Sequence, residues 1–277
     1  MININNEYRA LVANILQSGN KKKDRTGIGT LSKFGYAIHH DMQLGFPLLH
    51  IKKTSFKAAK TELLWILQGR TDLKYLEDNG VKYWRADYER SDRLDETLGP
   101  VYGFQWRNFN GIDQLYNLSW ELFNNPDSRR MIVSAWNPAD MKDMVLPPCH
   151  YGFQCYVNNG KLDLIWTQRS ADVILGLPYD IAMYGLLLEL LAKGHNLKPG
   201  KLIGQLGDCH IYNNHIEQAE EIIYRDPDKY NCPTLELNNI GVCAINKNKI
   251  NIPSLNSIKL NGYEHMGFLK APLNVGK

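Results

Sequence analysis

The chain has 277 residues, 44% of them hydrophobic, and a formal net charge of +3. This length and apolar content suit one domain of ordinary size, or a small pair of domains, with a sizeable core. The small net charge excludes a general role in binding polyanions such as nucleic acid, so an anion site must be built from a few arginines placed together.

The sequence also bears on membranes, metals and the compartment. It contains no apolar run of the ~18 residues that a membrane-spanning helix needs. The five cysteines are an odd number and lack the spacing of metal ligands, which argues against a disulfide framework. Residues 1–6 lack the basic, apolar and small-residue layout of a signal peptide. We therefore expect a cytoplasmic protein without a membrane partner or a bound metal.

Apolar periodicity predicts helices and strands in mixed order. The first helix, near 6–18, has Tyr8, Leu11, Val12 and Ile15 on one face. Further helices are predicted over 54–67, 113–124, 181–192 and near 214–224. Strands are predicted over 131–136, 151–157 and 161–167, with a turn at 158–160 between the last two.

The order of these elements favours one fold class. Helices and strands are interspersed without regular βαβ alternation, which favours α+β over a doubly wound sheet. No internal repeat, low-complexity tract or flexible linker interrupts the chain. The segment 83–96 is polar and irregular, which indicates an exposed insertion. We therefore predict a single α+β domain over residues 1–277.

Cys149 is a candidate nucleophile. It follows Pro147-Pro148, and because each proline fixes φ the cysteine is held on a rigid turn. Gln168-Arg169-Ser170 follows about twenty residues later, and an arginine brought close by the fold would favour the nucleophilic thiolate. The alternative is a buried cysteine acting as a small hydrophobe. The motif by itself leaves both interpretations open.

Eight short motifs occur in order along the chain. They are Asp24-Arg25-Thr26-Gly27, Glu62-Leu63-Leu64-Trp65, Leu98-Gly99-Pro100-Val101-Tyr102-Gly103, Asp127-Ser128-Arg129-Arg130, Pro147-Pro148-Cys149-His150, Gln168-Arg169-Ser170, Gly176-Leu177-Pro178 and His210-Ile211-Tyr212. Each is weak alone, but all eight in this order resemble the thymidylate synthase family. The resemblance implies a single mixed domain that forms a homodimer, sheet packed against sheet.

The resemblance implies folate-dependent one-carbon transfer to C5 of a pyrimidine deoxynucleoside 5′-monophosphate. Cys149 would add to C6 of the ring and so make C5 nucleophilic. The co-substrate 5,10-methylenetetrahydrofolate would supply the one-carbon unit. Glu62 matches a group that does acid–base chemistry through ordered water, and its place on an apolar helix would raise its pKa. Tyr102 matches the residue near the C5 proton.

The family's phosphate grip falls on four arginines of this chain. Arg25 and Arg169 match it together with the hydroxyl of Ser170, and a planar guanidinium suits a dianionic phosphate. Arg129 and Arg130 match a pair that reaches the site of the partner subunit. The alternative for this pair is a mere surface location, because adjacent residues on an extended segment point to opposite sides.

The remaining binding residues also follow from the resemblance. Gln168 is assigned to substrate binding, and His210 and Tyr212 match positions that bind the sugar 3′-hydroxyl. Without the resemblance, a core histidine and a structural tyrosine would be the better interpretation of those two. Trp84 and Asp172 match the pterin contacts, and Lys52 matches a contact for the anionic folate tail. The C-terminal segment with Val275 resembles a tail that closes over the cofactor and excludes water.

The main departure from the family is Asp180, where thymidylate synthases carry asparagine. An amide matches uracil, because its NH₂ donates to O4 and its carbonyl accepts from N3–H. A carboxyl group that shares a proton with N3 matches cytosine, and a mismatched base would leave buried polar groups unpaired. The alternative is an N-cap of the following helix, where Asn and Asp are near-equivalent.

The substrate and product predictions rest on two departures. Phage deoxycytidylate hydroxymethylases, which are relatives of thymidylate synthase, share the aspartate at 180. Asp87 replaces the second tryptophan of the usual Trp-Asp-x-Trp motif, and a less shielded site favours water over hydride. The sequence therefore predicts hydroxymethylation of dCMP, with thymidylate synthesis from dUMP or C5-methylation of dCMP as alternatives. A DNA cytosine methyltransferase is disfavoured because no Gly-rich strand-to-helix turn is present.

Overall fold

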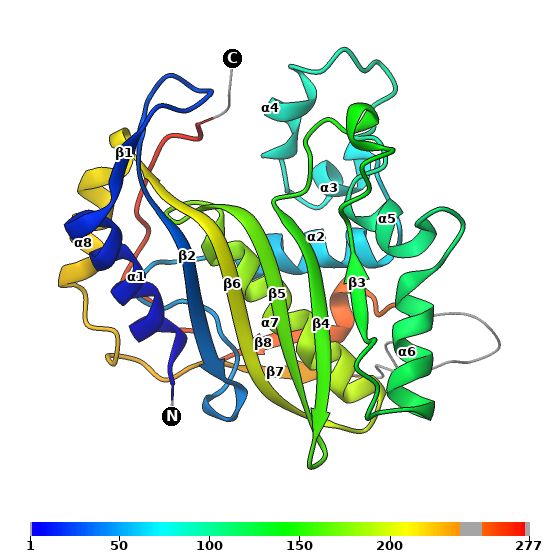
Figure 1. The fold of residues 1–277 in the computed structure, drawn as a ribbon. Coiled ribbons are helices and arrows are strands. Elements are labelled where there is room, and N and C mark those ends of the chain that lie inside the picture. The colour runs from blue at the N-terminus through cyan, green and yellow to red at the C-terminus, as the bar shows by residue number, and fades with distance from the viewer. Residues whose placement is uncertain (1, 239–250, 275–277) are drawn as a thin grey trace.

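The computed structural model describes residues 2–238 and 251–274. Its centre is a six-stranded sheet in the order β1-β2-β6-β5-β4-β3 (Figure 1). The strands are β1 (Asn20–Lys22), β2 (Thr30–Asp41), β3 (Ile132–Ser134), β4 (His150–Asn158), β5 (Lys161–Asp172) and β6 (Lys198–Tyr212). Neighbours are antiparallel except β5 and β6, which are parallel. A separate antiparallel pair joins β7 (Thr234–Leu237) to β8 (Ile258–Asn261).

Two helices lie behind the sheet in the view of Figure 1, namely α2 (Phe56–Leu67) and α7 (Leu177–Gly194). The crossover that makes β5 and β6 parallel runs through α7, which is buried along most of its length because it packs between the sheet and α2. The other elements are α1 (Ile4–Ser18), α3 (Leu73–Asp78), α4 (Trp84–Tyr88), α5 (Tyr102–Asn108), α6 (Gln114–Asn124), α8 (Ile216–Tyr224) and the 3-10 turns Met42–Leu44, Met141–Asp143, Asn213–His215 and Leu255–Ser257.

The predicted α+β class is confirmed, and so are the five predicted helices. The largest difference in a boundary is at α7, which begins at Leu177 rather than at 181. Pro178 lies in its first turn, where a proline is tolerated because the first backbone N–H groups of a helix have no intrahelical partner. The helix therefore includes Asp180, which is four residues past the N-cap Gly176.

Two of the longest strands, β2 and β6, were not predicted as such. The sequence of β6 contains Pro199 and three glycines, which weaken any strand signal. The structure explains two of these glycines. A Cβ on Gly204 would lie 2.5 Å from the ring of Trp166, and one on Gly207 would lie 2.8 Å from the carbonyl oxygen of Arg169. Glycine is thus required where β5 presses closely on β6.

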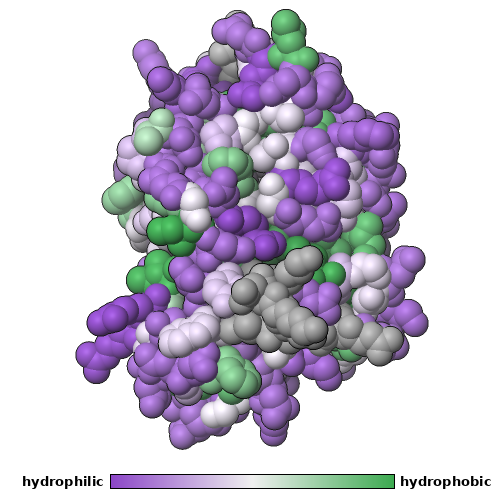
Figure 2. All heavy atoms as spheres, turned by 90° about the vertical axis from the view of Figure 1, so that its right-hand side faces the viewer, coloured by the Kyte–Doolittle hydropathy of each residue, from purple (hydrophilic) through white to green (hydrophobic). Residues whose placement is uncertain are grey.

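The face of the sheet opposite α2 and α7 is turned toward the viewer in Figure 1, and it carries exposed aromatic side chains. Phe34 is 87% exposed, Trp136 40% and Tyr151 38%. A shallow depression lined by Phe34, Tyr36, Tyr151 and Arg169 crosses four strands of this face. The side that lies at right in Figure 1 is mostly hydrophilic, with separate hydrophobic spots (Figure 2). Among the helices of the described residues, none is long and apolar enough to cross a membrane.

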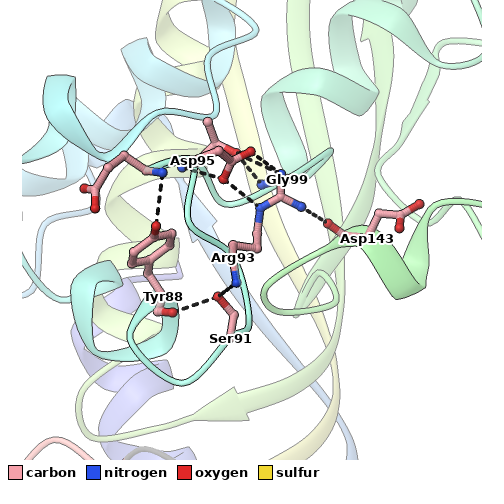
Figure 3. A network of polar contacts seen from close by, with 8 residues as sticks. Tyr88, Ser91, Arg93, Asp95, Gly99 and Asp143 are labelled. Atoms are coloured by element: carbon pink, nitrogen blue, oxygen red, sulfur yellow. Dashed lines mark hydrogen bonds and ion pairs between the residues drawn. The ribbon is translucent and has the colours of Figure 1, made fainter.

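The segment 83–96 is more ordered than its composition indicates. Its first part forms α4, with Trp84 and Tyr88 buried, so the prediction of an irregular insertion was wrong there. The loop that follows is braced by Arg93, whose guanidinium bonds Asp95 and, at 2.9 Å, the backbone oxygen of Asp143 (Figure 3). Charged residues made this segment look solvated, but they pair within the loop and hold it against the turn at 141–143.

Candidate active site

One cavity of about 390 Å³ gathers half of the predicted site residues. It is lined by Glu62, Tyr83, Trp84, Asp87, Tyr102, Leu146, Cys149, His150, Gln168, Ser170, Asp172, Leu175, Gly176, Tyr179, Asp180 and Leu273. These residues come from α2, α4, α5, the start of β4, the end of β5 and the start of α7. The sheet together with the start of α7 therefore supplies one wall, the sheet wall. The helices α2 and α4 supply the other, the helical wall.

Cys149 lies at the end of the Pro-Pro turn, directly before β4. Arg169 holds this turn by donating to two consecutive carbonyls, Nε to Pro148 and Nη2 to Pro147, both at 2.9 Å. The backbone N–H of Cys149 donates to the hydroxyl of Tyr102 at 2.9 Å. The side chain of Cys149 is partly exposed and lines the cavity, whereas Cys155 and Cys209 are buried. This placement favours a reactive cysteine over a small hydrophobe.

The expected effect of Arg169 on the thiol needs a correction. Burial raises the pKa of Cys149 to about 11, and the charge of Arg169 lowers it by less than burial raises it. The carboxyl groups of Asp180 and Asp87 act in the same direction as burial. The thiol form therefore prevails at neutral pH, and the thiol has to lose its proton when it attacks.

Glu62 projects from α2 and is 9% exposed. Two donors hold its carboxylate: the hydroxyl of Tyr83 donates to Oε2, and the indole N–H of Trp84 donates to Oε1 at 2.7 Å. Burial raises the pKa of Glu62, and the two hydrogen bonds oppose that rise. Tyr83 is not among the site residues predicted from the sequence. Its position next to Trp84 was the one signal that could have identified it.

Asp180 lies in the first turn of α7, and because Gly176 is the N-cap the alternative role of Asp180 as a helix cap is wrong. Its Oδ2 accepts a hydrogen bond of 2.8 Å from Nε2 of Gln168. The amide of Gln168 is itself oriented by Trp166, whose indole N–H donates to Oε1 at 3.1 Å. Burial raises the pKa of Asp180 to about 7, against the opposing bond from Gln168. The carboxyl group therefore exchanges its proton close to neutral pH.

His150 is a neutral neighbour of these groups. Its ring stacks on Tyr102, with centroids 4.2 Å apart, and its Nδ1 lies 2.9 Å from the hydroxyl of Tyr184. Burial lowers the pKa of His150 to about 3. The 4.0 Å approach of its Nε2 to Asp180 is therefore not an ion pair at neutral pH. His150 forms part of the floor beneath Tyr102 and Asp180.

The predicted phosphate and sugar residues lie partly around this cavity. Ser170 lines it, and the charge of Arg25, from the loop between β1 and β2, acts on Cys149 and Asp87. His210 and Tyr212 lie on β6 with their rings 5.2 Å apart. By contrast, Arg129 and Arg130 are exposed at the edge of the sheet, before β3, and do not line the cavity. Within one chain the structure does not bring that pair to the site.

The predicted folate residues are divided in the same way. Trp84 and Asp172 line the cavity, and Oδ1 of Asp172 accepts from the backbone N–H groups of Ile174 and Leu175 at 3.0 and 3.1 Å. Lys52 is 2% exposed, does not line the cavity and donates to the carbonyl of Ile174 at 2.6 Å. Val275 lies outside the described residues, while Leu273, near it in the chain, reaches the cavity.

In the part of the chain that the structure describes, no group of His, Cys, Asp and Glu side chains is arranged to hold a metal ion. The cavity instead offers a thiol, two buried carboxyl groups and flat aromatic surface. These groups suit covalent addition to a ring and proton transfer.

The comparisons with known proteins agree with this chemistry. The family model described as "Thymidylate synthase" matches residues 6–275. A curated protein named thymidylate synthase, from Phytoplasma mali (strain AT), is 42% identical over 293 residues, covering 97% of this chain and 99% of that relative. The fold and the matches are thus those of an enzyme that transfers one-carbon groups. The chain belongs to the thymidylate synthase family, whose co-substrate is methylenetetrahydrofolate.

Proposed function

We propose that this protein methylates C5 of dUMP to give dTMP, with methylenetetrahydrofolate as the one-carbon donor. The observation that supports this reaction is the relative named thymidylate synthase, which is similar over nearly the whole of both chains. The same comparison favours methyl transfer over the hydroxymethylation predicted from Asp180 and Asp87. Residues that line the cavity carry each chemical step of the proposed reaction.

Cys149 is the proposed nucleophile, adding its sulfur to C6 of the pyrimidine. The addition breaks the C5–C6 double bond and makes C5 electron-rich, so that C5 can accept a one-carbon unit. Glu62 and Tyr102 line the same cavity as Cys149 and are the proposed proton-transfer groups. Glu62 suits this role because burial raises its pKa towards the working range of a general acid–base group.

The outer part of the cavity fits a pterin. Trp84, Leu175 and Leu273 give it flat and apolar surface, and the carboxylate of Asp172 can accept from a ring N–H. When bound there, methylenetetrahydrofolate supplies the carbon unit and the reducing hydride. The residues of this chain orient it and exclude water from C5.

Asp180 fits uracil when it carries its proton. Gln168 donates to Oδ2, which leaves the proton for Oδ1. A protonated carboxyl group then donates to O4 of uracil and accepts from N3–H, as the amide of asparagine does. Because the pKa of Asp180 is about 7, this form is well populated at neutral pH.

The same carboxyl group supports dCMP as a second candidate substrate. With the proton on Oδ2 instead of Oδ1, its O–H can donate to N3 of cytosine while Oδ1 accepts from the 4-amino group. An asparagine whose carbonyl accepts from Gln168, as Oδ2 of Asp180 does, would turn its amino group toward the 4-amino group of cytosine, so that two donors would face each other. Asp180 is therefore compatible with both bases, and it is the observation that keeps dCMP as the alternative.

Product analysis tests the reaction. The enzyme is incubated with methylenetetrahydrofolate and either dUMP or dCMP, and the product mass and the absorbance of dihydrofolate are followed. We expect a methyl product from dUMP with dihydrofolate released. A hydroxymethyl product from dCMP without dihydrofolate would contradict the proposal and restore the prediction from the sequence. Turnover of neither nucleotide would remove both.

We also propose that the exposed sheet face is the surface of a homodimer. Phe34, Trp136 and Tyr151 expose aromatic surface on this face, and contiguous apolar surface of this kind marks an interaction site. Arg130 lies at the sheet edge next to this face, which suits its proposed reach into the site of the partner subunit. Sedimentation tests the assembly, and a monomer at micromolar concentration would contradict it.

A further inference from the structure

We propose that Tyr83 is a positioning residue for Glu62, holding its carboxylate in one orientation and favouring its ionised form. The inference rests on the proposed function, because it takes Glu62 as the group that transfers protons. It adds a residue to the site that the family motifs do not contain. It also assigns to the beginning of α4 the role of orienting Glu62, in addition to supplying Trp84.

The inference rests on the hydrogen bonds that Tyr83 and Trp84 donate to Glu62. Tyr83 and Trp84 are consecutive, and each donates to a different oxygen of Glu62. The first turn of α4 thus holds both oxygens of a side chain that projects from α2. A carboxylate held at both oxygens cannot turn about its last torsion without breaking a hydrogen bond. Its remaining lone pairs therefore keep a fixed direction in the cavity that Cys149 also lines.

The two donors differ in what they can do. The indole of Trp84 can only donate, so Oε1 has to stay an acceptor whether or not Glu62 is protonated. The hydroxyl of Tyr83 can donate or accept, and it can turn when a proton arrives on Oε2. Burial raises the pKa of Tyr83 well above its usual value, so the phenol keeps its own proton throughout. Tyr83 therefore adjusts to both protonation states of Glu62 without exchanging its proton.

Other titratable groups also face Glu62. They are Tyr102 on α5 and Tyr179 and Asp180 on α7, in addition to Tyr83. The phenols stay neutral, because burial raises the pKa of each. Asp180 is the one that changes charge near neutral pH, with a pKa of about 7. The pH experiment must therefore separate the titration of Glu62 from that of Asp180.

The test compares Tyr83→Phe with the wild type by the pH profile of kcat/KM. Removing one donor to a buried carboxylate should move the limb that depends on Glu62 upward by roughly one pH unit. We expect kcat to fall about tenfold, while KM for the nucleotide stays within about twofold. The same comparison in an Asp180→Asn background removes the second carboxyl group and should give the same shift.

Tyr88→Phe is the matched control. Tyr88 is a buried tyrosine of α4, and its hydroxyl accepts from the N–H of Glu96 at 3.1 Å (Figure 3), whereas the two donors to Glu62 are Tyr83 and Trp84. Its loss should leave the pH profile in place. Tyr83→Leu, which removes the ring as well, should shift the profile as much as Tyr83→Phe if the hydroxyl carries the effect.

A second measurement does not depend on turnover. The infrared carbonyl band of a protonated Glu62, identified by its loss in Glu62→Gln, should persist to higher pH in Tyr83→Phe. An unmoved band and profile, or equal shifts in Tyr88→Phe, would overturn the role of Tyr83. Full activity in Glu62→Gln would instead remove the proposed proton-transfer role of Glu62, so the two failures are distinguishable.

Discussion

Two walls of one cavity hold their carboxyl groups in different ways. On the helical wall, Glu62 of α2 receives two donors from α4. On the sheet wall, Asp180 of α7 receives one bond from Gln168 of β5. Burial raises the pKa of both, but Glu62 has two hydrogen bonds that favour its ionised form. One pocket thus holds two buried carboxyl groups whose hydrogen-bond donors oppose the effect of burial to different extents.

Cys149→Ser removes the group that both walls serve, and it should have the largest effect. We expect turnover to fall by ~10⁴-fold or more, because a serine hydroxyl is a far poorer nucleophile without a strong base beside it. Adduct formation with a 5-fluoropyrimidine nucleotide should be lost, and binding of the nucleotide should remain, as measured by calorimetry. Turnover near the wild-type level would remove the nucleophile assignment.

Asp180→Asn changes the carboxyl group of the sheet wall and leaves Glu62 of the helical wall intact. The amide matches uracil and opposes cytosine, so turnover of dCMP should fall by about 10³-fold or more while that of dUMP stays within roughly tenfold. Competition between the two nucleotides, read by product mass, measures this ratio. Glu189→Gln is the control, because Glu189 is a carboxyl group of the same helix that does not line the cavity. An unchanged base preference in Asp180→Asn would show that Asp180 does not read the base.

The pH dependence tests the proton on Asp180. The pKa is raised from 3.8 to about 7, so the carboxyl group is protonated below pH 7 and ionised above it. The ionised form cannot donate to O4, and kcat/KM for dUMP should therefore fall by up to about tenfold per pH unit above pH 7. Asp180→Asn has no proton to lose. The ratio of wild-type to variant activity should fall as pH rises, and a constant ratio between pH 6 and 9 would contradict the role of this proton.

Mixing two inactive subunits tests whether a residue of the partner subunit completes the active site. One subunit carries Arg130→Ala and the other Cys149→Ser, and each homodimer should be nearly inactive. If Arg130 serves the partner's site, a statistical mixture should recover about a quarter of wild-type activity, because half the dimers are mixed and each has one intact site. Arg90→Ala in place of Arg130→Ala is the control. No recovery from well-folded subunits that exchange would count against shared sites.

The residues of the sheet wall could largely be predicted from the sequence, whereas on the helical wall Glu62 and Trp84 could be predicted and Tyr83 could not. Gln168 and Asp180 belong to short motifs whose residues stay close in the chain. The contact of Tyr83 with Glu62 depends on how α4 packs on α2, and no local pattern encodes that packing. The same limit applies to Lys52, which the resemblance assigns to the anionic folate tail, whereas its Nζ donates to the carbonyl of Ile174 in the interior.

The direction of the net pKa shift of Cys149 was also hard to predict from the spacing of the motifs. Arg169 does lie beside Cys149, as the motif spacing indicated, and its charge does favour the thiolate. Burial outweighs it, because the cost of an ion in a closed pocket depends on every residue that excludes water. Sequence motifs thus identify which groups meet, and the packing of distant segments decides their protonation.

The strand order has a consequence for how the chain is made. β2 pairs along its length with β6, while on its other side β1 covers three residues. A ribosome completes β2 at residue 41 and β6 at residue 212, so the nascent strand waits for roughly ten to thirty seconds at usual elongation rates. During that time the edge that carries Phe34 has no partner strand on its β6 side. The central sheet therefore cannot close until β6 has been made, and fragments that end before residue 212 should aggregate rather than fold.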